Sequence, residues 1–191
     1  MKTNETEYED GKIEGLEVKD ENWIEDIKTV FQKIQFVHPF PDPQTEAFFT
    51  VIWKKSMEAF DSPREVQVIV DAKDDLYCSV GTFGFVSFKN QDGQLDGMKL
   101  PLKCWIHTHP FGRAFFSGTD WKTIKSWKGM MESATVLGDN QFISYDCNSE
   151  IAKQVQYGLY QQHPETDDKP EWVKAAEEVI GSKISLDGEE E

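Results

Sequence analysis

The chain has 191 residues, of which 38% are hydrophobic and 13% aromatic, enough for one sizeable core and too little for two. Its formal net charge of -15 makes nonspecific binding to nucleic acid or to an anionic membrane a poor expectation. We therefore expect a single domain that binds neither nucleic acid nor membrane.

The negative charge is concentrated at the two ends of the chain. Residues 1–26 and 165–191 each contain ten acidic and three basic residues, so the interior is nearly neutral. Residues 1–20 are short of apolar side chains, and burial therefore cannot offset the entropy of ordering them. We expect a disordered acidic segment over 1–20, a domain over 21–181, and an acidic tail over 182–191.

Hydrophobic periodicity predicts a sheet with helices around it. Apolar residues recur at helical spacing over 21–36 and 44–60, on either side of a proline-rich break. Runs of strand-forming residues separated by turn residues then follow. The order indicates an α+β or α/β class. The expected strands are 66–70, 76–80, 83–88, 98–106, 134–138 and 141–145, and the later helices are 119–131, 149–161 and 170–181.

The cysteines and the hydropathy suit a reducing, aqueous compartment. Cys78, Cys104 and Cys147 are an odd number at wide spacing, with no CxxC pair, and we interpret them as ordinary buried thiols. No run approaches the roughly 18 apolar residues of a spanning helix, and the N-terminus lacks a basic segment followed by an apolar one. We therefore expect a cytoplasmic protein.

One segment carries residues suited to metal chemistry. His107 and His109 stand at i and i+2 at the end of an apolar strand, where their side chains share a face. Pro110 cannot donate to a sheet ladder and ends the strand. Ser117 and Asp120 fall where the next helix begins, so the carboxylate can turn back toward the strand end.

Two imidazoles and one carboxylate suit a hydrolytic zinc site. They leave a net charge of about +1 and one open position for water, the arrangement of catalytic rather than structural zinc. Each part also has an ordinary explanation. His107 and His109 alone could be a partly buried pair, and Ser117 to Asp120 resembles a helix capping box with Asp in place of Glu. The combined spacing is much more specific than either part.

The motif resembles a known signature. His107-Thr108-His109-Pro110, six further residues, and Ser117-Gly118-Thr119-Asp120 match, position for position, the JAMM metalloproteases, also called the MPN-plus or JAB domain. The run 115–121 is most similar to small prokaryotic and phage-type members. The resemblance covers about 44–160. It implies a mixed sheet flanked by helices and one zinc ion per chain, held by His107, His109 and Asp120, with Ser117 stabilising the tetrahedral intermediate.

The resemblance also implies an upstream glutamate that activates the water. Glu65 matches the expected context, since it follows a helix and opens a strand. The chain departs from the family here, because Val66-Gln67 stands where a small residue and glycine are common. Glu58 is the competing candidate. An ordinary exposed glutamate at 65 is the third possibility.

The resulting expectation is a zinc metallopeptidase or isopeptidase. The family's association with ubiquitin-like and sulfur-carrier proteins implies a protein or peptide substrate, favouring the C-terminal tail of a small β-grasp protein. The alternative is a non-catalytic MPN-type scaffold, although such members usually lose a ligand or the glutamate. A zinc deaminase would need His-x-Glu and Pro-Cys-x-x-Cys, and neither is present.

Several other polar residues are assigned ordinary roles. His38 and His163 are expected at the surface, and Cys147 with His163 does not reproduce the second zinc cluster of ubiquitin-cleaving members. A basic patch beside the motif could orient an acidic partner or a carboxylate tail, but a solvated helix face is the preferred explanation. This patch consists of Arg113, Lys122, Lys125 and Lys128.

Overall fold

A six-stranded mixed sheet forms the centre of the molecule. The computed structural model describes residues 16–81, 97–156 and 170–180. The strands lie in the order β2-β1-β3-β4-β5-β6, with β3 and β4 parallel and all other neighbours antiparallel. The elements in chain order are α1 (Trp23–Phe31), α2 (Pro43–Glu58), β1 (Val66–Val70), β2 (Leu76–Val80), β3 (Cys104–Thr108), α3 (Gly118–Ser126), β4 (Ser133–Gly138), β5 (Gln141–Asp146), β6 (Ile151–Gln156) and α4 (Glu171–Ile180).

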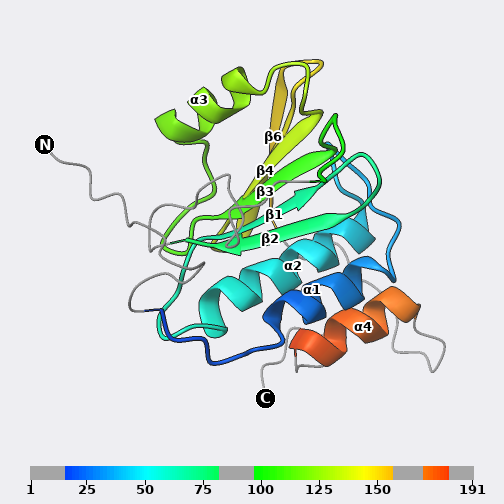
Figure 1. Cartoon of the computed structure of the whole chain (residues 1–191), viewed down its shortest axis with the longest axis vertical. Coiled ribbons are helices and arrows are strands. Elements are labelled where there is room, and N and C mark those ends of the chain that lie inside the picture. The colour runs from blue at the N-terminus through cyan, green and yellow to red at the C-terminus, as the bar shows by residue number, and fades with distance from the viewer. Residues whose placement is uncertain (1–15, 82–96, 157–169, 181–191) are drawn as a thin grey trace, which may run out of the picture.

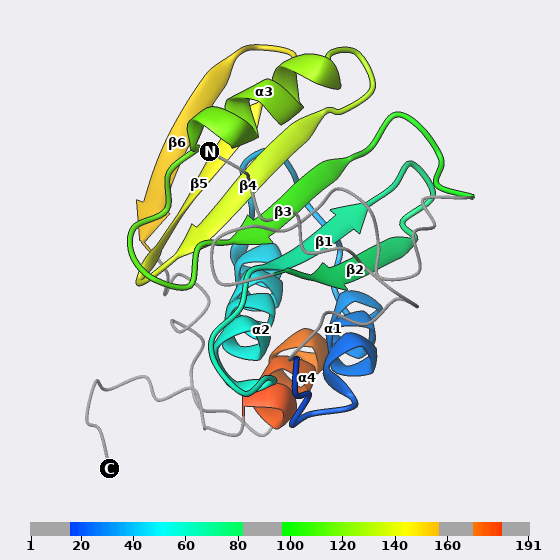
Figure 2. The ribbon, with the colours of Figure 1, turned by 60° about the vertical axis from the view of Figure 1, so that its left-hand side comes forward.

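Helices cover both faces of the sheet. Figures 1 and 2 show α1, α2 and α4 together on one face and α3 alone on the other. Every residue of β1, β3 and β4 is buried, as expected for strands covered on both sides. The α+β class with a mixed sheet and flanking helices is therefore confirmed.

Side-chain alternation divides the core into two clusters. In β1 and β3 the even-numbered residues, such as Val68 and Ile106, pack against α1, α2 and α4. The odd-numbered residues, such as Ile69 and Trp105, pack with Ile124 of α3. Because successive side chains of a strand point to opposite faces, a residue's parity in β1 and β3 decides which layer it joins.

Local sequence signals explain where α2 begins. Pro43 occupies the first turn, where a missing N–H costs nothing, and the Asp42 side chain accepts a hydrogen bond from the Thr45 amide at 2.9 Å. Apolar side chains of its inner face, among them Phe48 and Ile52, are fully buried. α1 and α3 are shorter than predicted, since 32–34 and 127–130 form turns.

The predicted strand over 98–106 is partly wrong. β3 begins only at Cys104 and continues through Thr108. Pro101 has no N–H to donate to a ladder, and the preceding residues bond to a turn instead: the Lys99 amide donates to the Asp71 carboxylate at 2.9 Å. His107 therefore lies within the strand. The strand predicted over 83–88 lies outside the described residues.

The helix predicted over 149–161 is wrong where the structure describes it, because Ile151–Gln156 is strand β6. Ile151 and Val155 are four residues apart, and side chains at that spacing share a face in a helix and in a strand alike. Pairing with β5 decides the outcome, with Phe142 opposite Val155. Residues 157–161 lie outside the described part.

The end of the predicted disordered segment is in fact packed. Val18 forms a bridge with Phe60, and the Lys19 amide donates to the Ala59 carbonyl at 2.9 Å. Lys55 holds this segment further, with its ammonium 2.6 Å from Asp20 and 2.5 Å from Asp26. Apolar contacts and a half-buried ion pair thus order residues 16–20. Residues 1–15 and 182–191 lie outside the described ranges.

None of the described helices combines the length and the hydropathy that crossing a lipid bilayer requires. The three cysteines are free thiols, with Cys104 buried and the other two half-buried. Burial raises the pKa of Cys78 to about 12 and that of Cys104 to about 11, which keeps both thiols protonated and unreactive at neutral pH.

Candidate metal centre

The two motif histidines lie on the face of the sheet that α3 covers. His107 is paired with Gln67 of β1 and with Val136 of β4, and its side chain is 1% exposed. His109 follows the end of β3, and its amide still donates to the Leu137 carbonyl at 2.8 Å. The pairing therefore continues past the strand end, and both imidazoles lie on one face with centroids 5.0 Å apart.

Asp120 reaches this pair from the start of α3. Because β3 and β4 are parallel, the connecting helix begins near the carboxyl end of β3, and its first turn lies beside the histidines. Asp120 Oδ1 lies 3.2 Å from His107 Nε2, and Oδ2 lies 3.6 Å from His109 Nε2. The predicted return of the carboxylate toward the strand end is present.

The capping interpretation of the same tetrapeptide is also correct. The Ser117 hydroxyl accepts from the Asp120 amide at 3.2 Å, and the Asp120 carboxylate accepts from the Ser117 amide at 2.6 Å. This reciprocal pair is a capping box. The cap fixes the rotamer of Asp120, so the two interpretations describe one arrangement.

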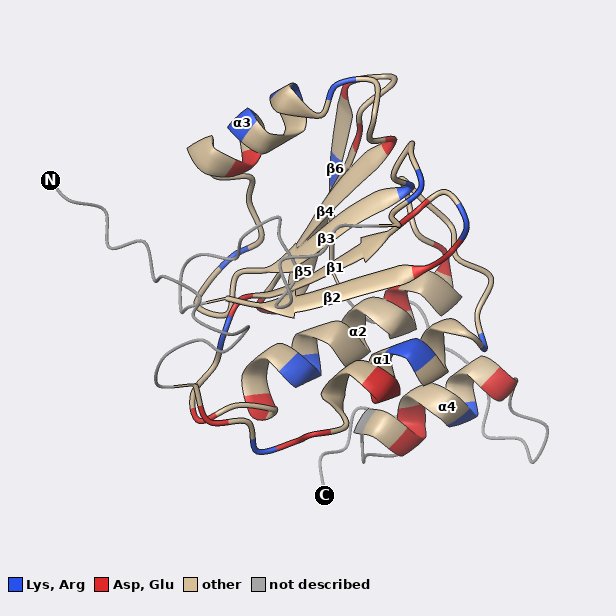
Figure 3. Ribbon diagram, in the orientation of Figure 1, with Lys and Arg blue, Asp and Glu red and all other residues tan. Residues whose placement is uncertain are grey.

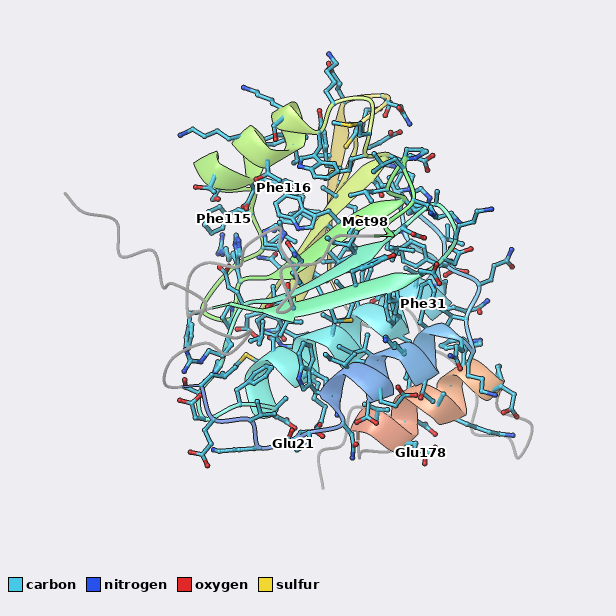
Figure 4. The ribbon with its side chains drawn as sticks, in the orientation of Figure 1. Glu21, Phe31, Met98, Phe115, Phe116 and Glu178 are labelled. Atoms are coloured by element: carbon cyan, nitrogen blue, oxygen red, sulfur yellow. The ribbon has the colours of Figure 1, made fainter. Side chains whose placement is uncertain are left out.

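A tight loop contact sets the position of α3. The Asp139 amide donates to the Gly112 carbonyl at 2.8 Å, which ties the loop after β3 to the end of β4. Gly138 lies so close to this loop that a Cβ there would stand 2.2 Å from the Ala114 nitrogen. Phe116 then packs against Trp121 at 5.1 Å between centroids, on the side of α3 that faces the sheet (Figure 4).

The donor atoms fit a metal ion. One ligand atom from each of His107, His109 and Asp120 lies within 4.8 Å of the others. Ligands about 2.0–2.1 Å from a tetrahedral zinc stand about 3.3 Å apart, close to the 3.2 Å between His107 Nε2 and Asp120 Oδ1. Both ring nitrogens of His107 are buried; among the described residues Nδ1 has no hydrogen-bond partner, and Nε2 faces the Asp120 carboxylate without the geometry of a hydrogen bond. A buried imidazole so placed is suited to a cation.

The protonation states also suit metal binding. Burial, followed by the nearby His107, lowers the pKa of His109 to about 4, against a weaker opposing effect of Asp120. Burial is the largest influence on Asp120 and raises its pKa, but contacts with His107 and Ser117 outweigh it and leave the pKa below its usual value. At neutral pH the centre therefore offers a neutral imidazole at 109 and an ionised carboxylate at 120.

A polar chain beneath the centre supports His107. The Trp105 indole stacks on the His107 ring, with centroids 4.4 Å apart and planes at 19°. Its Nε1–H donates to Gln67 at 2.8 Å, and the Gln67 amide donates to Ser79 at 3.2 Å. The sequence prediction did not identify Trp105 or Gln67. The sequence did offer a signal for each. Trp105 is two residues from His107 and Gln67 is two residues from Glu65, so in a strand each would share a face with its candidate.

The two candidate glutamates differ in burial and in the element that carries them. Glu65 is 8% exposed and immediately precedes β1. Continuing the β1–β3 register by two residues from Gln67 and His107 would bring Glu65 opposite His109, on the histidine face. Glu58 ends α2, which covers the other face, and its carboxylate is 60% exposed and pairs with Lys54 at 3.1 Å. The geometry therefore favours Glu65.

Exposed apolar and basic side chains lie on the loop after β3 and on and after α3. Phe115 is 55% exposed with its ring 5.0 Å from that of His109, and Phe111 is 54% exposed. The predicted basic residues are all exposed, and those of α3 appear in Figure 3. They are Arg113, Lys122, Lys125 and Lys128.

His38 is not the surface residue that was predicted. It is half-buried, its Nδ1 lies 3.1 Å from the Ser133 hydroxyl, and its Nε2 lies 3.4 Å from Glu132. His38 thus contacts residues at the start of β4. The cluster of His107, His109 and Asp120 lies near the other end of the β3–β4 pair and does not include it. His163 lies outside the described residues.

No protein-family model, curated protein or solved structure matches this chain.

Proposed function

We propose that this protein is a zinc-dependent hydrolase of the JAMM type that cleaves an amide or isopeptide bond. The observation that carries the proposal is the convergence of His107, His109 and Asp120, whose donor atoms lie within 4.8 Å at a largely buried centre. Three protein ligands of this kind leave a fourth position for water or substrate, which distinguishes hydrolytic from structural zinc sites. The motif resemblance supports the same class.

Zinc held there would supply Lewis acidity, making water nucleophilic near neutral pH and polarising a substrate carbonyl. Glu65 would accept a proton from the attacking water and pass it to the departing nitrogen as the C–N bond breaks. Its supporting features are its burial and the register of β1 with β3, whose continuation would bring it opposite His109. General acid–base catalysis of this kind contributes about 10² to 10⁴ in rate.

Ser117 would stabilise the developing oxyanion. Its Oγ accepts a hydrogen bond from the Asp120 amide, so its own hydroxyl hydrogen is not consumed by the cap. Loss of one such donor typically costs about 10² to 10³ in turnover. The residue would thus cap α3 and assist the reaction with different atoms of one side chain.

The proposed substrate is the C-terminal tail of a ubiquitin-like or sulfur-carrier protein. This class follows from the resemblance to the family. The exposed Phe111 and Phe115, which follow the histidines in the chain, give this surface an apolar character suited to an extended peptide.

Metal content gives the first test. Protein purified without chelator should carry about one zinc per chain by mass spectrometry, and His107→Ala should remove it. His38→Gln is the matched control, because this half-buried histidine lies outside the cluster, and it should retain the metal. A wild-type protein that hydrolyses substrate with no metal bound would refute the site.

Turnover gives the second test. C-terminal aminocoumarin amides of small β-grasp proteins are suitable probes. Glu65→Gln should retain zinc and lose at least about 10²-fold in kcat, while Glu58→Gln should behave as wild type. Full activity of Glu65→Gln would exclude it as the base. Zinc-loaded wild-type protein inactive on every probe would favour the scaffold alternative.

A further inference from the structure

Thr108 stands between the two motif histidines but makes its contacts with a different strand. It is fully buried, and by alternation its side chain points away from the face that His107 and His109 share. Its Oγ1 accepts a hydrogen bond from the Val66 amide at 2.9 Å and donates to the Arg64 carbonyl at 3.4 Å. One hydroxyl therefore binds the backbone on both sides of Glu65.

This contact replaces the sheet ladder where the ladder ends. The backbone register of β1 with β3 runs from Val70 to Gln67, opposite His107. Beyond that pair the Thr108 side chain, rather than its backbone, bonds to the chain entering β1. The Glu65 carbonyl is held separately, by the Gly81 amide at 2.8 Å. Both peptide groups that flank Glu65 are thus fixed to a neighbouring strand or its end.

We propose that Thr108 is a positioning residue that holds Glu65 at the metal centre. The inference depends on the proposed function, because it takes Glu65 to be the base. The physical reason is that a carboxylate must lie within hydrogen-bond reach of the proton it removes, and a displacement of about 1 Å can cost 10²-fold in rate. We call the two hydrogen bonds of the Thr108 hydroxyl the Thr108 clamp. Because Thr108 lies between the two proposed ligand histidines, the clamp ties the base to the same short segment that carries the ligands.

The first test compares Thr108→Val with Thr108→Ser. Valine keeps the shape and loses the hydroxyl, whereas serine keeps the hydroxyl. Thr108→Val should lower kcat about 10- to 100-fold on the aminocoumarin probes, with KM and zinc affinity within about threefold of wild type. Thr108→Ser should retain turnover within about threefold. Equal turnover of Thr108→Val and wild type would overturn the inference while leaving the proposed function intact.

A double-mutant cycle separates positioning from a general structural effect. If Thr108 acts through Glu65, Thr108→Val should cause no further loss of kcat in the Glu65→Gln background. Multiplicative losses would show that Thr108 affects turnover by another route, and would overturn the inference.

Amide hydrogen exchange tests the hydrogen bond from the Val66 amide to Thr108 directly and needs no substrate. The Val66 amide should exchange at least about tenfold faster in Thr108→Val, while that of Val68, inside the β1–β3 ladder, should be unchanged. An unchanged Val66 rate would contradict the clamp even in an inactive protein. Should Thr108→Val fail to fold, Thr108→Ala replaces it in each measurement. Zinc-loaded wild-type protein inactive on every probe would overturn the proposed function and this inference together.

Discussion

His107 Nε2 lies 3.2 Å from Asp120 Oδ1, joining a buried strand to the first turn of the helix that follows it. The other oxygen of the same carboxylate accepts the Ser117 amide at 2.6 Å. Asp120 therefore completes the helix cap and faces the histidines at once. A variant can separate these two roles, since the cap needs only an oxygen acceptor whereas a cation favours a charged ligand.

Asp120→Asn should preserve α3 and weaken metal binding. Its amide oxygen can still accept from Ser117, but the negative charge is lost, and zinc affinity should fall at least about 100-fold. Asp120→Ala should also lose the reciprocal half of the capping box, the hydrogen bond from the Ser117 amide, while the Ser117 hydroxyl still accepts from the amide of residue 120, and it should destabilise the metal-free protein by about 0.5–1.5 kcal/mol. Competition with a chromophoric chelator and urea denaturation measure the two effects. Wild-type zinc affinity in Asp120→Asn would exclude this carboxylate as a ligand.

Gly138→Ala should disturb the centre from a distance. The new Cβ would stand 2.2 Å from the Ala114 nitrogen, so the loop leading to α3 must shift and carry Asp120 with it. We expect about 1–3 kcal/mol of destabilisation in denaturant unfolding, together with weaker zinc binding. Gly118→Ala is the matched control, since nothing lies within 4 Å of a Cβ there. Equal stability of the two variants would contradict the close approach.

The metal-free protein should lose stability as the pH falls from about 6.5 toward 4. The pKa of His109 is about 4 when folded, against an ordinary value of 6.5, so the unfolded state binds more protons in this window. The contribution is fully present above about pH 6.5. His109→Gln should flatten the curve of unfolding free energy against pH. His38, whose pKa burial also lowers, contributes with the same sign and remains in that variant.

Metal binding should change the fluorescence of Trp105. Its indole stacks on His107 with centroids 4.4 Å apart, so a cation on that imidazole alters its electrostatic surroundings. Titration of metal-free protein with zinc should change the intrinsic emission, and Trp105→Phe should remove most of the change without altering stoichiometry. Trp53→Phe, on α2 across the sheet, should leave it intact. If zinc changes the emission of Trp105→Phe as much as that of wild type, another tryptophan is responsible for the signal.

The sequence by itself determined the features that neighbouring residues decide. Runs of strand-forming residues between turn residues predicted β1 and β2 at their observed bounds, and the Ser117 to Asp120 spacing identified a helix start. The two histidines and the carboxylate were predicted together for the same reason. Strand alternation and helix capping are local rules, so side-chain directions could be inferred over a few residues without knowledge of the fold.

Only the tertiary structure decided what depends on pairing between distant segments. Ile151 and Val155 suited a helix until pairing with β5 made them part of β6. Glu65 and Glu58 stayed alternatives in the sequence, and the structure favours Glu65 because it is buried next to β1 whereas Glu58 is exposed at the end of α2. The Thr108 clamp joins β3 to the chain entering β1 and has no local signature. Register depends on burial and hydrogen bonding of the whole sheet, and these forces act between residues far apart in the chain.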